Sequence, residues 1–206
     1  MTRLYDQMFN WPNVLTIVRI SVIPLLVIFY YLPVPWGHLA AAILFTIASV
    51  TDWLDGYLAR YLKQTTKLGA FLDPVADKLM VSIALVLIVA EPTFQFVSLN
   101  ASVYTIPTCV ITIPAAIIVA REIIVSALRE WMAEIGKRTS VAVSSLGKIK
   151  TTAQMFTLIL LLYCDNTTSS TIIIISYVLL YVSAVLTIWS MLIYLKAAWA
   201  QLVISE

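Results

Sequence analysis

The sequence contains little charge for its length. Only 12% of its 206 residues are Asp, Glu, Lys or Arg, whereas 61% are hydrophobic, and the formal net charge is +2. With a mean hydropathy of +0.95, this composition excludes an ordinary soluble domain and is typical of a protein that crosses the bilayer several times. The sequence has no nucleic-acid-binding signature, internal repeat or low-complexity tract, so we expect no nucleic-acid partner.

Soft metal ligands are also scarce, since the chain has two cysteines and one histidine. Cys109 and Cys164 could pair in an oxidising compartment, but we expect two free thiols within lipid-embedded helices. His38 is expected to lie at the membrane interface rather than to bind a ligand. A cleaved signal peptide is not expected, because the first hydrophobic segment is too long and lacks a small-residue cleavage site.

The apolar segments predict an all-α integral membrane protein with six transmembrane helices. The expected spans are residues 13–32, 38–60, 68–90, 104–120 with a helical extension toward 134, 148–163 and 171–196. Residues 13–198 would form a six-helix bundle within a single membrane domain of residues 1–206. Residues 1–12 are expected to form an interfacial helix or a frayed terminus. Because of Pro74, the third helix is expected either to begin near Asp73 or to be kinked there.

The basic residues predict the orientation of these spans. The connections around 33–37, 91–103 and 164–170 contain no Lys or Arg, whereas those around 60–67 and 137–150 contain seven between them. By the positive-inside rule, the basic connections and both termini are cytoplasmic. The 91–103 connection is unusually long, and the sequence indicates no function for it.

Four carboxylates lie beside or inside these apolar segments, where each ionised side chain costs roughly 2.5 to 3.5 kcal/mol. In helices, Asp52 and Asp55 are three residues apart and Asp73 and Asp77 four apart, so each pair shares one face. A cage of oxygen ligands with no His or Cys nearby favours Mg²⁺ or Mn²⁺, and two such ions would neutralise four acids. Structural acids neutralised by Lys or Arg are the alternative.

The same stretch resembles the signature of the CDP-alcohol phosphatidyltransferase family at every fixed position. The matching residues are Asp52, Asp55, Gly56, Ala59, Arg60, Gly69, Asp73 and Asp77. The resemblance implies that the four Asp bind the two metal ions and that Asp77 is also the catalytic base. It further implies a site for CDP-diacylglycerol made by Asp52, Gly56, Ala59, Arg60 and Gly69.

Polar residues on the first span provide a supporting stripe. Asn13, Thr16 and Arg19 follow one another at three-residue intervals, which places them near one face of a helix. We expect this stripe to face the carboxylates, although an arginine that reaches toward the membrane surface is the alternative for Arg19. The run resembles the branch of the family that uses sn-glycerol 3-phosphate.

Most of the remaining charge lies between residues 121 and 150. Arg121 and Arg129 can flank one helix surface, with Glu122 and Glu130 offset from it. We expect Arg121, Arg129, Lys148 and Lys150 to bind the phosphate of the acceptor. An ordinary basic surface that meets anionic lipid headgroups is the alternative, above all for Lys137 and Arg138.

The depth of the charged residues and the resemblance together predict the reaction. The cytoplasmic ends of the predicted helices carry the four Asp, Arg19, Arg60, Arg121, Arg129, Lys148 and Lys150. This depth is expected for a cavity open to the cytoplasm and the bilayer. The resemblance implies transfer of a phosphatidyl group from CDP-diacylglycerol to sn-glycerol 3-phosphate with release of CMP. It also implies a homodimer in the bacterial inner membrane, with an active site that faces the cytoplasm.

Three alternatives remain open. A family member with inositol phosphate or serine as acceptor would share the Asp motif. Intramembrane prenyltransferases also use Asp-rich metal sites, but the later helices contain no second Asp-rich motif. A cation transporter could use membrane acids, although it would place them near the midplane with a route to both faces.

Overall fold

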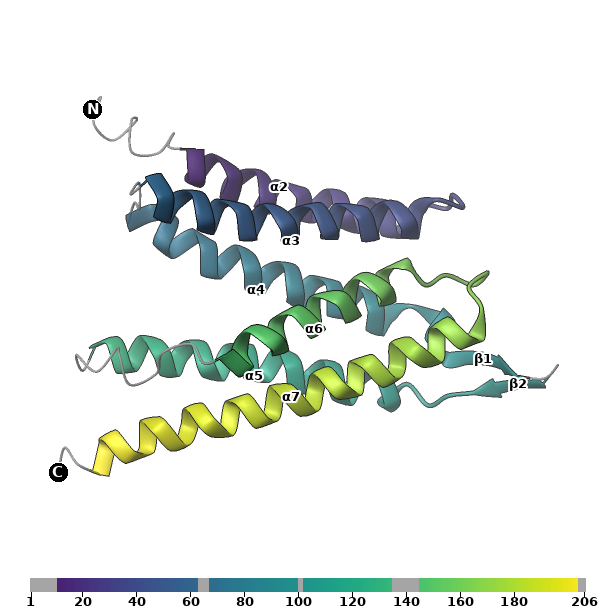
Figure 1. Ribbon diagram of the computed structural model, residues 1–206. Coiled ribbons are helices and arrows are strands. Elements are labelled where there is room, and N and C mark those ends of the chain that lie inside the picture. The colour runs from purple at the N-terminus through teal and green to yellow at the C-terminus, as the bar shows by residue number, and fades with distance from the viewer. Residues whose placement is uncertain (1–10, 63–66, 100–101, 135–144, 204–206) are drawn as a thin grey trace. The chain divides into compact units, whose positions relative to one another are not determined.

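The computed structural model describes residues 11–62, 67–99, 102–134 and 145–203, and the labels below are those of Figure 1. Within these residues the chain forms six long helices. They are α2 (Trp11–Tyr31), α3 (Gly37–Leu62), α4 (Lys67–Ala90), α5 (Cys109–Glu134), α6 (Ser145–Tyr163) and α7 (Ser170–Val203). Each helix covers most of one predicted span, which confirms a mainly α-helical chain. The predicted interfacial helix falls almost wholly outside the described residues.

One of the sequence-based boundaries is wrong, and one of the two alternatives given for the third helix is excluded. The fourth helix was expected from residue 104, but Tyr104 belongs to a β-strand and α5 begins at Cys109. The third helix does not begin near Asp73, because α4 starts at Lys67 and continues through Pro74. Asp73 therefore has a full helical turn before it and is not an N-cap.

Three helices are long and apolar enough to cross a membrane when only the described residues are considered. These segments are Val14–Tyr31, Cys109–Glu134 and Ser170–Trp199, and Gly37–Asp52 is a shorter apolar helix. Large apolar side chains project from α4 and α7, with Val86 64% and Trp189 63% exposed. Such exposure suits side chains that meet lipid rather than water. The chain is thus an α-helical membrane protein.

The chain divides into two compact units, and the first contains Met1–Ala90 with Ile159–Asp165. In this unit α2 packs against both α3 and α4 (Figure 1). Alanines on the contacting faces let the helices approach closely, and Ala41, Ala48, Ala76 and Ala84 are almost fully buried. Gly37 begins α3, where an added Cβ would lie 2.7 Å from the Phe29 carbonyl oxygen. The turn between α2 and α3 therefore needs glycine.

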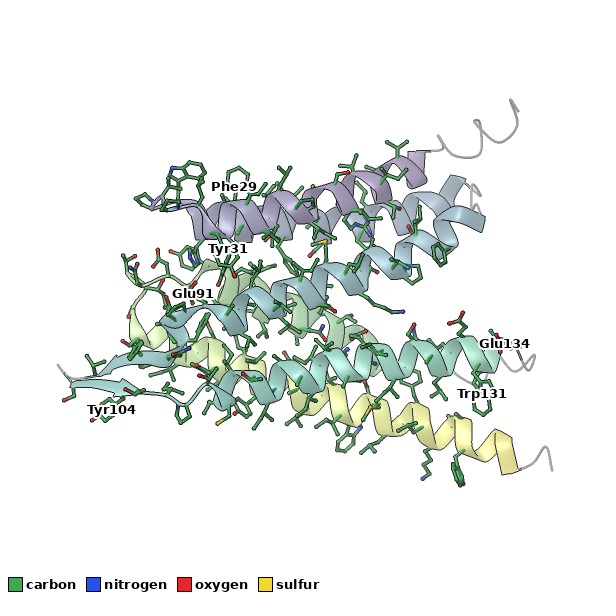
Figure 2. The ribbon with its side chains drawn as sticks, turned by 180° about the vertical axis from the view of Figure 1, so that it is seen from behind. Phe29, Tyr31, Glu91, Tyr104, Trp131 and Glu134 are labelled. Atoms are coloured by element: carbon green, nitrogen blue, oxygen red, sulfur yellow. The ribbon has the colours of Figure 1, made fainter. Side chains whose placement is uncertain are left out.

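The second unit contains Glu91–Leu158 and Asn166–Glu206, and in it α5 packs along α7 (Figure 1). The long connection before α5 is not unstructured. It forms the short 3-10 helix η1 (Pro92–Gln95) and the antiparallel hairpin of β1 (Phe96–Leu99) and β2 (Ser102–Thr105). The Tyr177 hydroxyl donates to the carbonyl oxygen of buried Phe94, which ties this segment to α7. The Tyr104 side chain projects from β2 (Figure 2).

The structure describes both cysteines and the single histidine. Both cysteines are free thiols, Cys109 exposed and Cys164 buried, which confirms the expectation that they do not pair. The His38 ring lies 4.4 Å from the Tyr30 ring between centroids, and its Nδ1 has no hydrogen-bond partner among the described residues.

Candidate functional site

The acidic motif lies on two neighbouring helices of the first unit. Asp52 lies on α3, and Asp73 and Asp77 lie one turn apart on α4. Both helices pack against α2, so their carboxylates can meet the polar residues of that helix. The side chains of Asp52 and Asp77 are 35% and 42% exposed, which leaves them accessible to a ligand.

Arg19 of α2 holds two of these acids together. Its Nη1 lies 2.6 Å from Asp52 Oδ1 and 3.1 Å from Asp77 Oδ1, and its side chain is only 1% exposed. A buried guanidinium needs compensating charge, and these carboxylates supply it from two different helices. The contact also requires the oxygens of Asp52 and Asp77 to converge on one nitrogen atom.

The third acid contacts the same polar stripe one turn earlier. The Thr16 hydroxyl donates to Asp73 Oδ1 over 2.6 Å, and Thr16 is completely buried. Thr16 and Arg19 therefore bring Asp52, Asp73 and Asp77 to one face of α2. The sequence predicted such a stripe, and the structure supports its orientation for these two residues.

The donor chemistry of this group fits a hard divalent cation, because every ligand it offers is an oxygen atom. Among the described side chains, no group of three or more His, Cys, Asp or Glu residues is gathered closely enough to hold a metal. Arg19 instead lies between Asp52 and Asp77, where it provides positive charge. Asp52, Asp73 and Asp77 nevertheless all contact side chains of α2, Asp73 through Thr16 and the other two through Arg19.

For several predicted residues the structure describes only the backbone. The backbones of Asn13, Asp55, Gly56, Ala59 and Arg60 lie within α2 and α3, but their side chains fall outside the described part of the structure. Helical backbone from Gly37 to Leu62 still keeps Asp52 and Asp55 three residues apart on one helix. Gly69 is buried in α4.

The predicted cationic residues lie in the second unit. Arg121 and Arg129 are on α5, the second of them two residues before Trp131, which lies near the end of this helix in Figure 2. Arg121 is 7% exposed, and Arg129 is exposed. Lys150 on α6 is 1% exposed. The Lys148 side chain, and both Lys137 and Arg138, fall outside the described part of the chain.

Glu122 joins this cluster, contrary to the expectation that it would be offset from the arginines. Glu122 Oε1 accepts from Lys150 Nζ over 2.5 Å and from Arg121 Nη1 over 3.2 Å. A lysine as buried as Lys150 needs such a partner, because an isolated charge in a low-dielectric environment is strongly unfavourable. Glu122 therefore compensates part of the positive charge.

Two residues of α7 complete the cluster and were not predicted. Arg121 Nη2 donates to Ser190 Oγ over 2.9 Å, and Arg129 Nη2 donates to the Tyr194 hydroxyl over 3.0 Å. The guanidinium carbons of Arg121 and Arg129 lie 5.9 and 5.1 Å from the centre of the Tyr194 ring. The regular spacing of Ser183, Thr187, Ser190 and Tyr194 in an otherwise apolar helix was the available signal.

Comparison with known proteins agrees with the family that the Asp motif resembles. The sequence profile of the CDP-alcohol phosphatidyltransferase family matches residues 9–189. The chain is 54% identical over 193 residues to CDP-diacylglycerol–glycerol-3-phosphate 3-phosphatidyltransferase of Yersinia enterocolitica, with 94% of this chain and 97% of the relative covered. Proteins of the same name from Shigella flexneri and Yersinia pestis are 52% and 53% identical over the same shares. The resemblance inferred from the Asp motif is confirmed.

Proposed function

This chain belongs to the CDP-alcohol phosphatidyltransferase family, and we propose that it transfers the phosphatidyl group of CDP-diacylglycerol to sn-glycerol 3-phosphate. The products are phosphatidylglycerophosphate, a precursor of phosphatidylglycerol and cardiolipin, and CMP. The observation that carries this proposal is the similarity of nearly the whole chain to relatives that bear the name of this reaction. We also propose that residues 1–206 form one family domain; the support is that the family match, over residues 9–189, includes residues of both compact units.

The acids of the first unit bind the donor substrate through divalent cations. Asp52, Asp55, Asp73 and Asp77 would hold two Mg²⁺ or Mn²⁺ ions, for which their oxygen atoms are suitable ligands. When bound, these ions neutralise the pyrophosphate and stabilise the charge that develops on the leaving phosphate. Gly56, Ala59, Arg60 and Gly69 complete the site for the cytidine nucleotide. Thr16 and Arg19 position the acids, with Asn13 on the same stripe.

Asp77 acts as the general base. It takes the proton from a hydroxyl of glycerol 3-phosphate, and the hydroxyl oxygen forms a new bond to the phosphorus of the phosphatidyl group. The bond between that phosphorus and the bridging oxygen of CMP breaks, and CMP leaves with this oxygen. Arg19 donates to Asp77 Oδ1, which keeps the carboxylate oriented.

The cations of the second unit bind the phosphate of the acceptor. Arg121, Arg129 and Lys150 carry three positive charges, and Glu122 compensates one of them. The two remaining positive charges match a phosphate monoester, which carries about −1.5 to −2 at neutral pH. Lys148 would add a further cation. This charge balance favours an acceptor that carries phosphate over serine.

We further propose that all six long helices cross the bacterial inner membrane and that both termini and the active site face the cytoplasm. The support is the distribution of Lys and Arg along the sequence, which avoids the 33–37, 91–103 and 164–170 connections. The helices α3, α4 and α6 would then cross the membrane despite their charged residues, which is the known pattern for functional intramembrane groups. The functional protein is a homodimer, as the resemblance implies.

A panel of acceptors tests the proposed reaction. The purified protein in vesicles is given CDP-diacylglycerol, Mg²⁺ and, in turn, glycerol 3-phosphate, inositol phosphate or serine. Lipid product is expected only with glycerol 3-phosphate. Product with inositol phosphate or serine would show a different acceptor, and ion flux without CMP release would indicate a transporter.

A further inference from the structure

The helix α7, which lies outside the acidic motif, holds the arginines that we propose to bind the acceptor. Tyr194 and Ser190 lie four residues apart on α7, so they share one face of that helix. Tyr194 is 4% exposed and Ser190 is 3% exposed. Their side chains are therefore packed in fixed positions rather than free to rotate in solvent.

Tyr194 makes two kinds of contact with the arginines. Its hydroxyl accepts from Arg129 Nη2 over 3.0 Å, and its ring lies within 6 Å of both guanidinium groups, close enough for a cation–π interaction. Arg129 is exposed, and an exposed arginine without such a contact would sample many rotamers. The tyrosine therefore reduces the conformational entropy that Arg129 loses when it binds an anion.

Ser190 makes the corresponding contact with the other arginine. Its hydroxyl accepts from Arg121 Nη2 over 2.9 Å and donates to the Thr187 carbonyl oxygen. Because the serine proton is directed to the backbone, its oxygen remains oriented as an acceptor for the guanidinium. Arg121 is thus held from α7 by Ser190 and from its own helix by Glu122.

From these contacts we infer that Ser190 and Tyr194 are positioning residues that fix Arg121 and Arg129 for the phosphate of the acceptor. Neither residue is required to touch the substrate. The inference rests on the proposed function, since it assigns the acceptor phosphate to these arginines. Substitutions at the two positions should therefore weaken the use of glycerol 3-phosphate and leave CDP-diacylglycerol binding unchanged.

The central test compares Tyr194→Phe with Tyr181→Phe. Both substitutions remove one hydroxyl hydrogen bond from α7, but Tyr181 donates to the Val110 carbonyl oxygen and contacts neither arginine. Tyr194→Phe is expected to raise KM for glycerol 3-phosphate about threefold to tenfold, as for one lost hydrogen bond. KM for CDP-diacylglycerol should stay within about twofold. Tyr181→Phe should leave both KM values unchanged, and equal effects of the two variants would overturn the inference.

A double substitution separates positioning from general stability. If Tyr194 acts through Arg129, then Tyr194→Phe should change KM for glycerol 3-phosphate by less than about twofold once Arg129→Ala is present. Independent, multiplying effects would contradict a positioning role. Ser190→Ala provides a second variant that acts through Arg121, with the same selective rise in KM for glycerol 3-phosphate expected.

The inference and the proposed function fail in different ways. If wild-type protein releases no CMP in response to glycerol 3-phosphate, the proposed function is wrong, and the inference falls with it. If wild-type protein is active and both Tyr194→Phe and Ser190→Ala keep the wild-type KM for glycerol 3-phosphate, only the positioning role is wrong.

Discussion

Arg19 of α2 and Asp52 of α3 form an ion pair with 2.6 Å between Nη1 and Oδ1, and the arginine side chain is almost fully buried. The same nitrogen contacts Asp77 of α4. One arginine therefore links three helices of the first unit and gathers two acids of the family motif.

Arg19→Ala is predicted to destabilise the protein when no divalent cation is present. It leaves Asp52 and Asp77 close together without their positive partner, at an expected cost of about 1 to 3 kcal/mol. This is less than for a fully buried pair, because both carboxylates are partly exposed. The midpoint of thermal unfolding in detergent should fall, and Mn²⁺ should restore more stability to the variant than to wild type. Lys196→Ala, at an exposed position on α7, is the control. Unchanged stability in Arg19→Ala would contradict the linking role.

Asp77→Asn is predicted to reduce turnover by about a hundredfold to ten-thousandfold, the usual contribution of a general base. The amide keeps the shape of the carboxyl group but cannot accept the hydroxyl proton. Binding of CDP-diacylglycerol, measured by direct titration, should be largely preserved. An Asp77→Asn variant that turns over at near the wild-type rate would exclude Asp77 as the base.

The acidic part of the site could be predicted from sequence because charge is rare in these apolar segments. Asp52, Asp73 and Asp77 are conspicuous there, and helical spacing places Asp73 and Asp77 on one face. The contacts of Ser190 and Tyr194 could not be predicted in the same way. Serine and tyrosine are common in membrane helices, and only the packing of α5 along α7 shows which arginines they meet.

The two β-strands were not predicted because the sequence pattern of each is short. Phe96–Leu99 and Ser102–Thr105 are strands of only four residues each, too few for a period of two to stand out from an apolar tract.

Glu122 was misplaced for another reason. Its neighbour in sequence, Arg121, points to a different side of an ideal helix, but long side chains allow both to meet near Lys150.

Activity is predicted to require an added divalent cation. Chelation with EDTA should abolish CMP release, and Mg²⁺ or Mn²⁺ should restore it, because four clustered acids would otherwise repel the pyrophosphate of the donor. The acids should also bind Mn²⁺ directly, with weaker binding in Asp73→Asn. Full turnover after exhaustive chelation would rule out a catalytic metal.

Arg129→Ala is predicted to lower kcat/KM for glycerol 3-phosphate roughly tenfold to a hundredfold, since it removes one charge-assisted contact worth about 1.5 to 3 kcal/mol. Arg129→Lys should recover only part of the activity, because an ammonium cannot reproduce the planar fork of the guanidinium. Lys137→Ala is the control for a generic basic surface. Equal effects at Arg129 and Lys137, both dependent on anionic lipid, would dismiss the acceptor site.

Glu122 and Lys150 are predicted to be coupled in stability. Glu122→Gln leaves buried Lys150 without its carboxylate, and a loss of about 1 to 3 kcal/mol is expected. The double variant Glu122→Gln with Lys150→Met should recover part of this loss, because the uncompensated charge is gone. Glu134→Gln, at the exposed end of α5 (Figure 2), is the matched control. Additive losses in the double variant would contradict the pairing.

The most direct test of phosphatidyl transfer follows labelled glycerol 3-phosphate and CMP in the same reaction. Purified wild-type protein in vesicles containing CDP-diacylglycerol and Mg²⁺ should incorporate the label into lipid and release an equal amount of CMP. Omission of glycerol 3-phosphate should stop both processes. CMP release that does not depend on glycerol 3-phosphate, or the absence of label in the lipid fraction, would contradict the proposed reaction.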